Sequence, residues 1–126
     1  MDCDYPFLRD VASPLTSDML RPLDPRCRIV QFSRALTAND YRVLADWMTQ
    51  YPLVTLRAYG SYDGSIRDLD FLRFFPTLSK FCANALFLSL QSIDGLSYLP
   101  PTVTRIGLGR TKKRLSLKPL GHFTHL

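Results

Sequence analysis

The chain has 126 residues, of which 46% are hydrophobic and 21% charged, with a formal net charge of +5. This composition is typical of one soluble folded domain, and it excludes an intrinsically disordered chain. No stretch reaches the ~20 apolar residues of a transmembrane helix. The acidic start Met1–Asp4 also lacks the positive start and apolar run of a secretory signal. We therefore expect a soluble protein that is neither exported nor bound to a membrane.

The cysteines indicate a reducing compartment. There are three of them, Cys3, Cys27 and Cys82, and no two have the spacing of metal ligands. A disulfide framework needs an even set, and small secreted domains use many more cysteines. We expect reduced thiols and a cytoplasmic location.

Residues 1–27 form a proline-rich segment. Pro6, Pro14, Pro22 and Pro25 divide it into pieces too short for a stable helix. It also contains several apolar residues, which is unusual for a disordered tail. Two interpretations stay open, namely an arm with little order and a strip that covers the open end of a core.

Residues 28–52 predict a strand followed by a helix. The β-prone run Arg28–Phe32 comes first. Thr37 is then a suitable N-cap, with Asp40 three residues later. The apolar residues that follow recur at the spacing of one helical face; they are Tyr41, Leu44, Ala45, Met48 and Tyr51. Pro52 ends the helix.

Residues 53–126 divide into three similar segments. Each opens with an apolar residue, then a second three positions later and a third two positions after that. The openings start at Leu53, Leu78 and Val103, which are 25 residues apart. Each segment ends with apolar residues three apart. This pattern predicts a strand followed by a return turn of helix, and the period lies in the range of ~20–29 residues for leucine-rich repeats.

These residues resemble the leucine-rich repeat family from Leu53 to Leu126, with residues 28–52 as a degenerate capping repeat. The resemblance implies an α/β fold, a short right-handed solenoid with a parallel sheet on its inner face and a helical cap at the N-terminal end. The Asn often found after the strand is absent, and Ser61, Leu86 and Thr111 stand there. The last repeat has no polar closing segment. The chain is then either an N-terminal fragment of a longer, bacterial-type repeat protein, or it self-associates through the open terminal repeat.

The resemblance also implies a function, because the inner face or its rim usually binds another protein and most members have no catalytic residues. We expect a non-catalytic protein–protein interaction module that binds its partner through the inner face of the repeat sheet and the adjacent Tyr59–Asp63 loop, with no cofactor and no metal. The identity of the partner does not follow. On the inner face, alternation along the strands predicts one column of Thr55, Lys80 and Arg105 and another of Arg57, Cys82 and Gly107. The predicted partner-binding residues are Thr55, Arg57, Tyr59, Tyr62, Lys80, Cys82, Asn84 and Arg105. The other interpretation is that they only face water.

A basic segment gives the alternative function. Residues 105–118 contain six cations and no acid, and four of the cations are Arg110, Lys112, Lys113 and Arg114. Such a cluster suits a polyanion or nucleic acid. No aromatic residue for base stacking lies among them. A solvated loop explains the charges equally, so nucleic-acid binding stays the second hypothesis. His122 and His125 lack further ligands for zinc.

Overall fold

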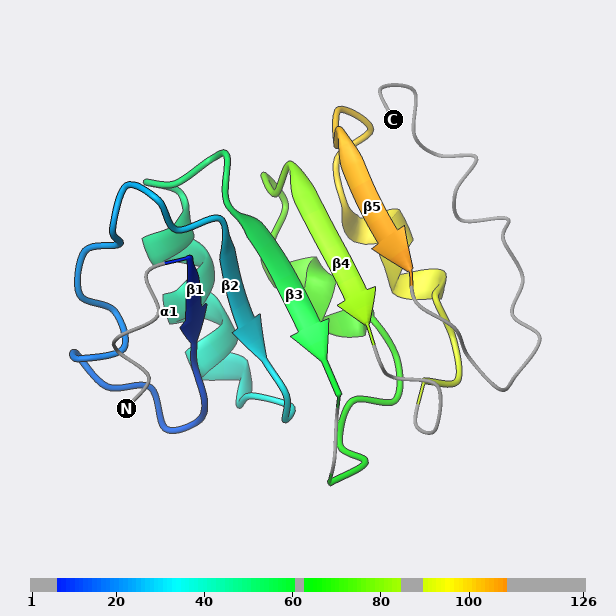
Figure 1. Cartoon of the computed structure of the whole chain (residues 1–126). Helices are drawn as coiled ribbons and strands as arrows, with labels where there is room; N and C mark the ends of the chain where they lie inside the picture. The colour runs from blue at the N-terminus through cyan, green and yellow to red at the C-terminus, as the bar shows by residue number, and fades with distance from the viewer. Residues whose placement is uncertain (1–6, 61–62, 85–89, 109–126) are drawn as a thin grey trace.

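The computed structural model describes residues 7–60, 63–84 and 90–108. In these residues five strands form one parallel sheet, and they follow one another across it in sequence order (Figure 1). The strands are β1 (Leu8–Asp10), β2 (Ile29–Phe32), β3 (Thr55–Tyr59), β4 (Lys80–Asn84) and β5 (Arg105–Leu108). Helix α1 (Ala38–Met48) and the 3₁₀ helices η1 (Asp70–Phe74) and η2 (Asp94–Tyr98) lie on one face of the sheet. The predicted α/β class with a parallel sheet is confirmed.

The strands pair in the register that the repeat spacing predicts. Val30 pairs with Leu56, Leu56 with Phe81, and Phe81 with Ile106. The side chains of Val30, Leu56 and Phe81 are each 0% exposed. Alternate side chains of a strand point to opposite faces of the sheet, so the neighbours of these residues face solvent. The inward positions predicted for β2, β3 and β4 are therefore correct.

Helix α1 begins where its cap was expected. The Thr37 hydroxyl accepts a hydrogen bond from the Asp40 backbone N–H at 3.1 Å, which satisfies one free donor of the first turn. Tyr41, Leu44 and Met48 are buried, as the spacing predicts. The helix ends at Met48, four residues before Pro52. Its buried face holds it against the sheet.

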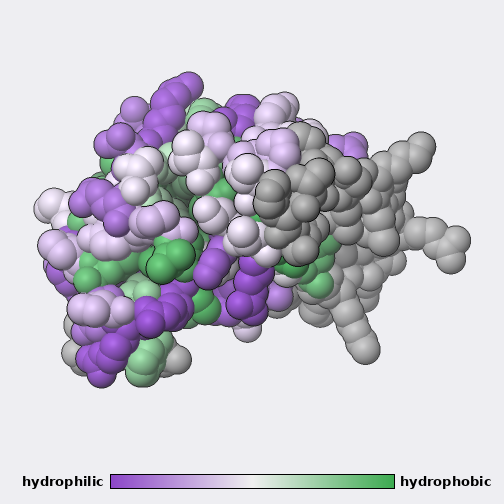
Figure 2. Space-filling model, turned by 90° about the horizontal axis from the view of Figure 1, so that it is seen from above, coloured by the Kyte–Doolittle hydropathy of each residue, from purple (hydrophilic) through white to green (hydrophobic). Residues whose placement is uncertain are grey.

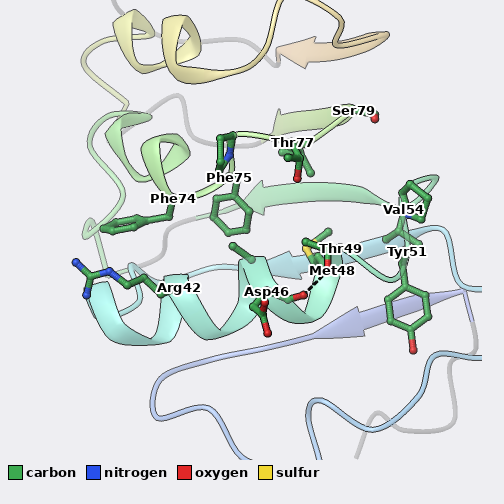
Figure 3. Close-up of a pocket in the computed structure, with 14 residues that line it drawn as sticks. Arg42, Asp46, Met48, Thr49, Tyr51, Val54, Phe74, Phe75, Thr77 and Ser79 are labelled. Atoms are coloured by element: carbon green, nitrogen blue, oxygen red, sulfur yellow. Dashed lines mark hydrogen bonds between the residues drawn. The ribbon is translucent and has the colours of Figure 1, made fainter.

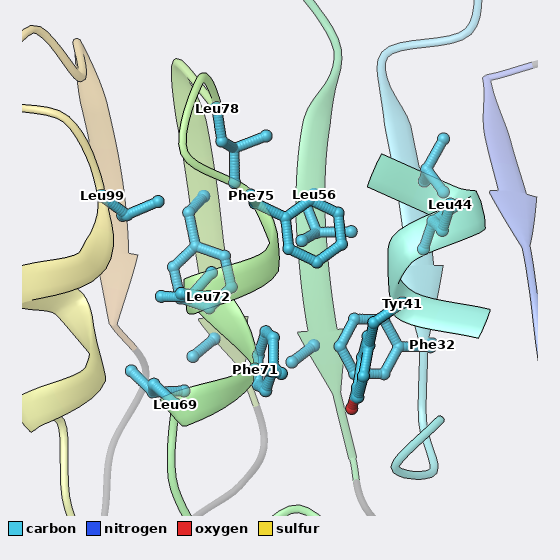
Figure 4. Packing of buried hydrophobic residues seen from close by; sticks show 14 of the residues in the cluster. Phe32, Tyr41, Leu44, Leu56, Leu69, Phe71, Leu72, Phe75, Leu78 and Leu99 are labelled. Atoms are coloured by element: carbon cyan, nitrogen blue, oxygen red, sulfur yellow. The ribbon is translucent and has the colours of Figure 1, made fainter. Parts of the chain in front are cut away.

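Tyr41 is the centre of an aromatic cluster in the core (Figure 4). Its ring stacks on Phe71 with centroids 5.4 Å apart and meets Phe32 edge-on at 5.7 Å. The Leu36 backbone N–H donates a hydrogen bond to the Tyr41 hydroxyl at 3.1 Å. Burial raises the pKa of this hydroxyl above its usual value, with only partial opposition from that hydrogen bond. The cluster connects α1 to η1 and to strand β2.

The two return turns approach each other more closely than any side chain allows. Gly95 of η2 is buried against η1. A Cβ atom on Gly95 would lie 2.2 Å from both the backbone carbon and oxygen of Leu69. Leu69 and Leu72 of one return, with Leu96 and Leu99 of the other, are at most 1% exposed. Glycine at position 95 therefore permits η1 and η2 to pack closely against each other.

Residues 7–27 lie against the first edge of the sheet. They contribute β1, which the sequence did not predict, and they pack Leu15, Met19, Leu20 and Leu23 against the core. Arg9 pairs in register with the buried Val30. Its guanidinium donates from Nη1 to the carbonyl oxygens of Met19 at 2.7 Å and Arg21 at 3.0 Å. At the first edge of the sheet, the row of buried side chains Val30, Leu56 and Phe81 therefore ends at a charged, hydrogen-bonded arginine.

Leu53 departs from the predicted pattern. Its counterparts Leu78 and Val103 are buried, but Leu53 is 72% exposed and Val54 is buried in its place. Val54, Leu78 and Val103 each donate a backbone hydrogen bond to a carbonyl three residues earlier, so these are the equivalent positions. Two positions separate Val54 from Leu56, whereas three separate Leu78 from Phe81. The connection between α1 and β3 is therefore one residue shorter than the connection between η1 and β4. Because of this missing residue, Leu53 points outward to solvent.

The shorter connection predicts opposite effects at neighbouring residues. We expect Val54→Ala to lower the free energy of unfolding by about 1–3 kcal/mol, because it removes buried methyl groups and leaves a cavity. Leu53→Ala should change it by about 0.5 kcal/mol or less, since Leu53 is exposed. Urea denaturation of both variants measures the difference. A larger loss for Leu53→Ala than for Val54→Ala would contradict this register.

Candidate functional site

The sheet has one face that no described helix covers, the face turned toward the viewer in Figure 1. Seven of the eight predicted partner-binding residues lie on its strands; those on β3 and β4 alternate with buried residues, and Arg105 is exposed at the start of β5. They are Thr55, Arg57 and Tyr59 on β3, Lys80, Cys82 and Asn84 on β4, and Arg105 on β5. Tyr62 lies outside the described residues. We refer to these seven residues as the candidate face.

The strand register brings the residues of the candidate face together. Lys80 is the partner of Arg105, and Tyr59 is the partner of Asn84. Cys82 stands between Arg57 on one side and Gly107 on the other. Adjacent strands lie about 4.8 Å apart, so these partners are direct neighbours. The predicted column of Arg57, Cys82 and Gly107 and the predicted neighbours Lys80 and Arg105 therefore lie side by side in the sheet.

Arg57 is fixed by a chain of polar contacts across three strands. Its Nε and Nη2 donate to the Gln31 side-chain oxygen at 2.9 and 2.5 Å. Gln31 in turn donates from Nε2 to Asp10 at 2.8 Å. The Arg57 guanidinium carbon also lies 4.8 Å from the centre of the Tyr59 ring, a cation–π distance. We call Asp10, Gln31, Arg57 and Tyr59 the polar relay; it holds the guanidinium in one orientation.

The sequence alone did not indicate Asp10 and Gln31. Gln31 precedes Arg57 by 26 positions, the same offset that separates Val30 from Leu56, so strand spacing was a usable signal. Asp10 had no such signal, because β1 lies in the proline-rich segment and is only three residues long. The proximity of Gln31 to Arg57 could therefore be predicted from the sequence, whereas the contact between Gln31 and Asp10 could not.

Cys82 of the candidate face lies beside Gly107 of β5. The Cys82 thiol is free and partly exposed, whereas the free thiol of Cys27 is buried. A Cβ atom on Gly107 would lie 2.8 Å from the Cys82 sulfur, so the sulfur occupies the space beside the glycine. A side chain at position 107 would displace it. This neighbourhood provides a low surface between the cations of β3, β4 and β5.

The electrostatics of the candidate face are positive. Strands β3, β4 and β5 carry Arg57, Lys80 and Arg105 and contain no acidic residue. Ion pairs among the described residues involve other arginines, namely Arg21, Arg26 and Arg34. The face therefore presents cations that have no described carboxylate as partner. The candidate face therefore attracts negatively charged groups of a binding partner.

A hollow lies on the opposite side of the sheet, between α1 and residues 74–79 (Figure 3). It has a volume of about 550 Å³, and its lining is largely apolar, with Met48, Phe75 and Leu78 among the residues. In Figure 3 the Arg42 side chain stands at one end of this groove and points away from its centre.

The described residues contain no cluster of three or more potential metal ligands, and none of their helices has the length and apolar character needed to cross a bilayer. The basic residues Arg110, Lys112, Lys113 and Arg114 lie outside the described residues. Comparison with family models, with curated proteins and with solved structures gives no match.

The polar relay predicts that Gln31 controls the mobility of Arg57. In Gln31→Ala we expect the Arg57 Nε–H resonance to exchange faster with water, because its acceptor is lost. The free energy of unfolding should fall by about 1 kcal/mol or less, as for other solvent-accessible hydrogen bonds. NMR of arginine side chains measures the first effect. Gln50→Ala, an exposed glutamine just beyond α1, is the matched control, and an unchanged Arg57 signal in Gln31→Ala would contradict the relay.

Proposed function

We propose that the chain is a non-catalytic protein–protein interaction module and that the candidate face binds its partner. The proposal includes a finer fold, a short right-handed leucine-rich repeat solenoid capped at the N-terminal end by α1 and the residues before it. The regular strand register and the repeated return turns support it. In such stacks each unit buries the apolar face of its neighbour, and the solvent-exposed sheet face, which is the inner face of the solenoid, stays free for binding.

The observation that carries the proposal is the ordered Arg57 beside Tyr59. Arginine and tyrosine are the residue types most often found at the centre of binding interfaces. An arginine usually loses side-chain freedom when it binds, and this opposes association. Here Gln31 already restrains it through two hydrogen bonds. The Arg57 side chain therefore loses its conformational entropy when the chain folds and loses less of it on binding. This favours binding through Arg57.

Two parts of the proposal concern residues outside the described part. Arg110, Lys112, Lys113 and Arg114 are the basis of the alternative, polyanion or nucleic-acid binding, and no acidic residue follows Asp94 in the sequence. Self-association through the last repeat is tested by a size measurement at several concentrations. The free thiols of Cys27 and Cys82 suit the proposed cytoplasmic location.

The test is retention of a partner from extract of the source organism by the tagged, full-length chain. We expect a retained protein to be lost on Arg57→Glu and on Tyr59→Ala, because both variants remove the centre of the candidate face. The loss should reach about tenfold or more, the range of interface hot spots. Quantitative mass spectrometry of the retained proteins measures it.

The control is the double variant Lys112→Glu, Lys113→Glu, which changes the net charge more than Arg57→Glu does. It should retain the same protein. Loss of retention in this control together with full retention by Arg57→Glu would refute the proposal. If the retained material were also nucleic acid, and its binding fell steeply with salt, the alternative would hold instead.

A further inference from the structure

A hollow of about 460 Å³ lies where β2, β3 and β4 begin, next to the candidate face. Its apolar lining includes Leu23, Tyr51, Pro52 and Leu53. Figure 2 shows this end of the molecule, where apolar surface is exposed among polar side chains. The volume lies in the range of about 300–1,000 Å³ found for ligand pockets, large enough for a bulky side chain.

Leu53 is the most exposed of the large apolar side chains in the described part of the chain. It reaches the surface because the first connection is one residue shorter than the others, as described above. A leucine that is exposed beside a hollow lets an incoming apolar side chain remove both surfaces from water. The hollow therefore has an apolar contact at its rim.

Lys80 connects the hollow to the candidate face. It lines the hollow, and it is also the register partner of Arg105. The hollow's own carboxylate, Asp24, is already engaged: Arg26 binds it with contacts of 3.0 and 3.1 Å. The side-chain hydrogen bond from Arg26 also lowers the pKa of Asp24. An incoming carboxylate therefore meets Lys80 without competition from Asp24.

From this juxtaposition we infer that the partner presents an acidic segment with one large apolar side chain. The apolar side chain fills the hollow beside Leu53, and the neighbouring carboxylates contact Lys80, Arg105 and Arg57. Strands lie about 4.8 Å apart and an extended chain advances about 3.3 Å per residue, so the acidic positions fall within about three residues of the apolar one. This inference rests on the proposed function and specifies the chemistry of its partner.

A protein segment fits this surface better than a nucleic acid does. Three cations neutralise few phosphates, whereas nucleic-acid binders commonly contact about six to ten. A protein segment can bury an apolar side chain in the hollow, which adds to its binding free energy. A phosphate backbone has no such side chain to bury. The ring of Tyr59 is already engaged by Arg57, so it is less available for stacking on a base.

The experiment is an NMR titration of the isotope-labelled, full-length chain with a capped peptide in which one leucine is flanked by glutamates. We expect shifts at the amides of Leu53, Val54, Lys80 and Arg105. Lys80→Glu should weaken binding about tenfold, through lost attraction and added repulsion. Leu53→Ser should weaken it about fivefold, and so should a peptide with serine in place of leucine, because each removes apolar burial.

The matched control is Arg67→Glu, which makes the same change of charge at an exposed site near η1. It should bind the peptide as the parent chain does. Equal weakening by Arg67→Glu and Lys80→Glu, shifts that miss the hollow, or tighter binding of a single-stranded oligonucleotide of equal charge would each overturn the inference.

A competition assay separates this inference from the proposed function. The peptide should displace the partner that the parent chain retains from extract. If Arg57→Glu abolishes retention but excess peptide does not compete, the candidate face binds a protein of other chemistry, and only the inference fails. If retention does not depend on Arg57 while the peptide binds at Lys80, the proposed function fails as stated.

Discussion

Val30, Leu56 and Phe81 stand side by side in a fully buried row across three neighbouring strands. No single strand of four or five residues can bury such side chains alone, so each depends on the strands beside it. The row fixes the register, because a slip of one residue would exchange buried and exposed side chains along the whole strand. It is through this row that Arg57 and Lys80 come to face solvent on adjacent strands.

Much of this arrangement follows from local rules that a sequence displays. The constant spacing of Leu56, Phe81 and Ile106 predicts the strand pairing, and Thr37 predicts the start of α1. The inward or outward direction of each strand residue then follows from alternation alone. The seven residues of the candidate face could therefore be predicted from the sequence alone.

The remaining features depend on tertiary contacts or on the exact length of a connection. The exposure of Leu53 results from one missing residue, which the apolar spacing conceals because Leu53 itself is apolar. Strand β1 is too short to show a pattern, and the inward arginine at position 9 is tolerated only because carbonyl groups of the following loop surround its guanidinium. The contact between Gln31 and Asp10 needs β1 and was hidden for the same reason.

The return segments differ in width, and this has a consequence for the shape of the sheet. Neighbouring α-helices pack about 8–10 Å apart, about twice the spacing of strands, whereas a 3₁₀ helix is a tighter and narrower coil. Behind β2 the returning chain is the helix α1; behind β3 and β4 it is η1 and η2, which are five residues each. A wide element forces the backs of the strands apart and bends the sheet around it. We therefore expect the sheet to curve most between β2 and β3 and to be flatter near β5, where Lys80 and Arg105 lie.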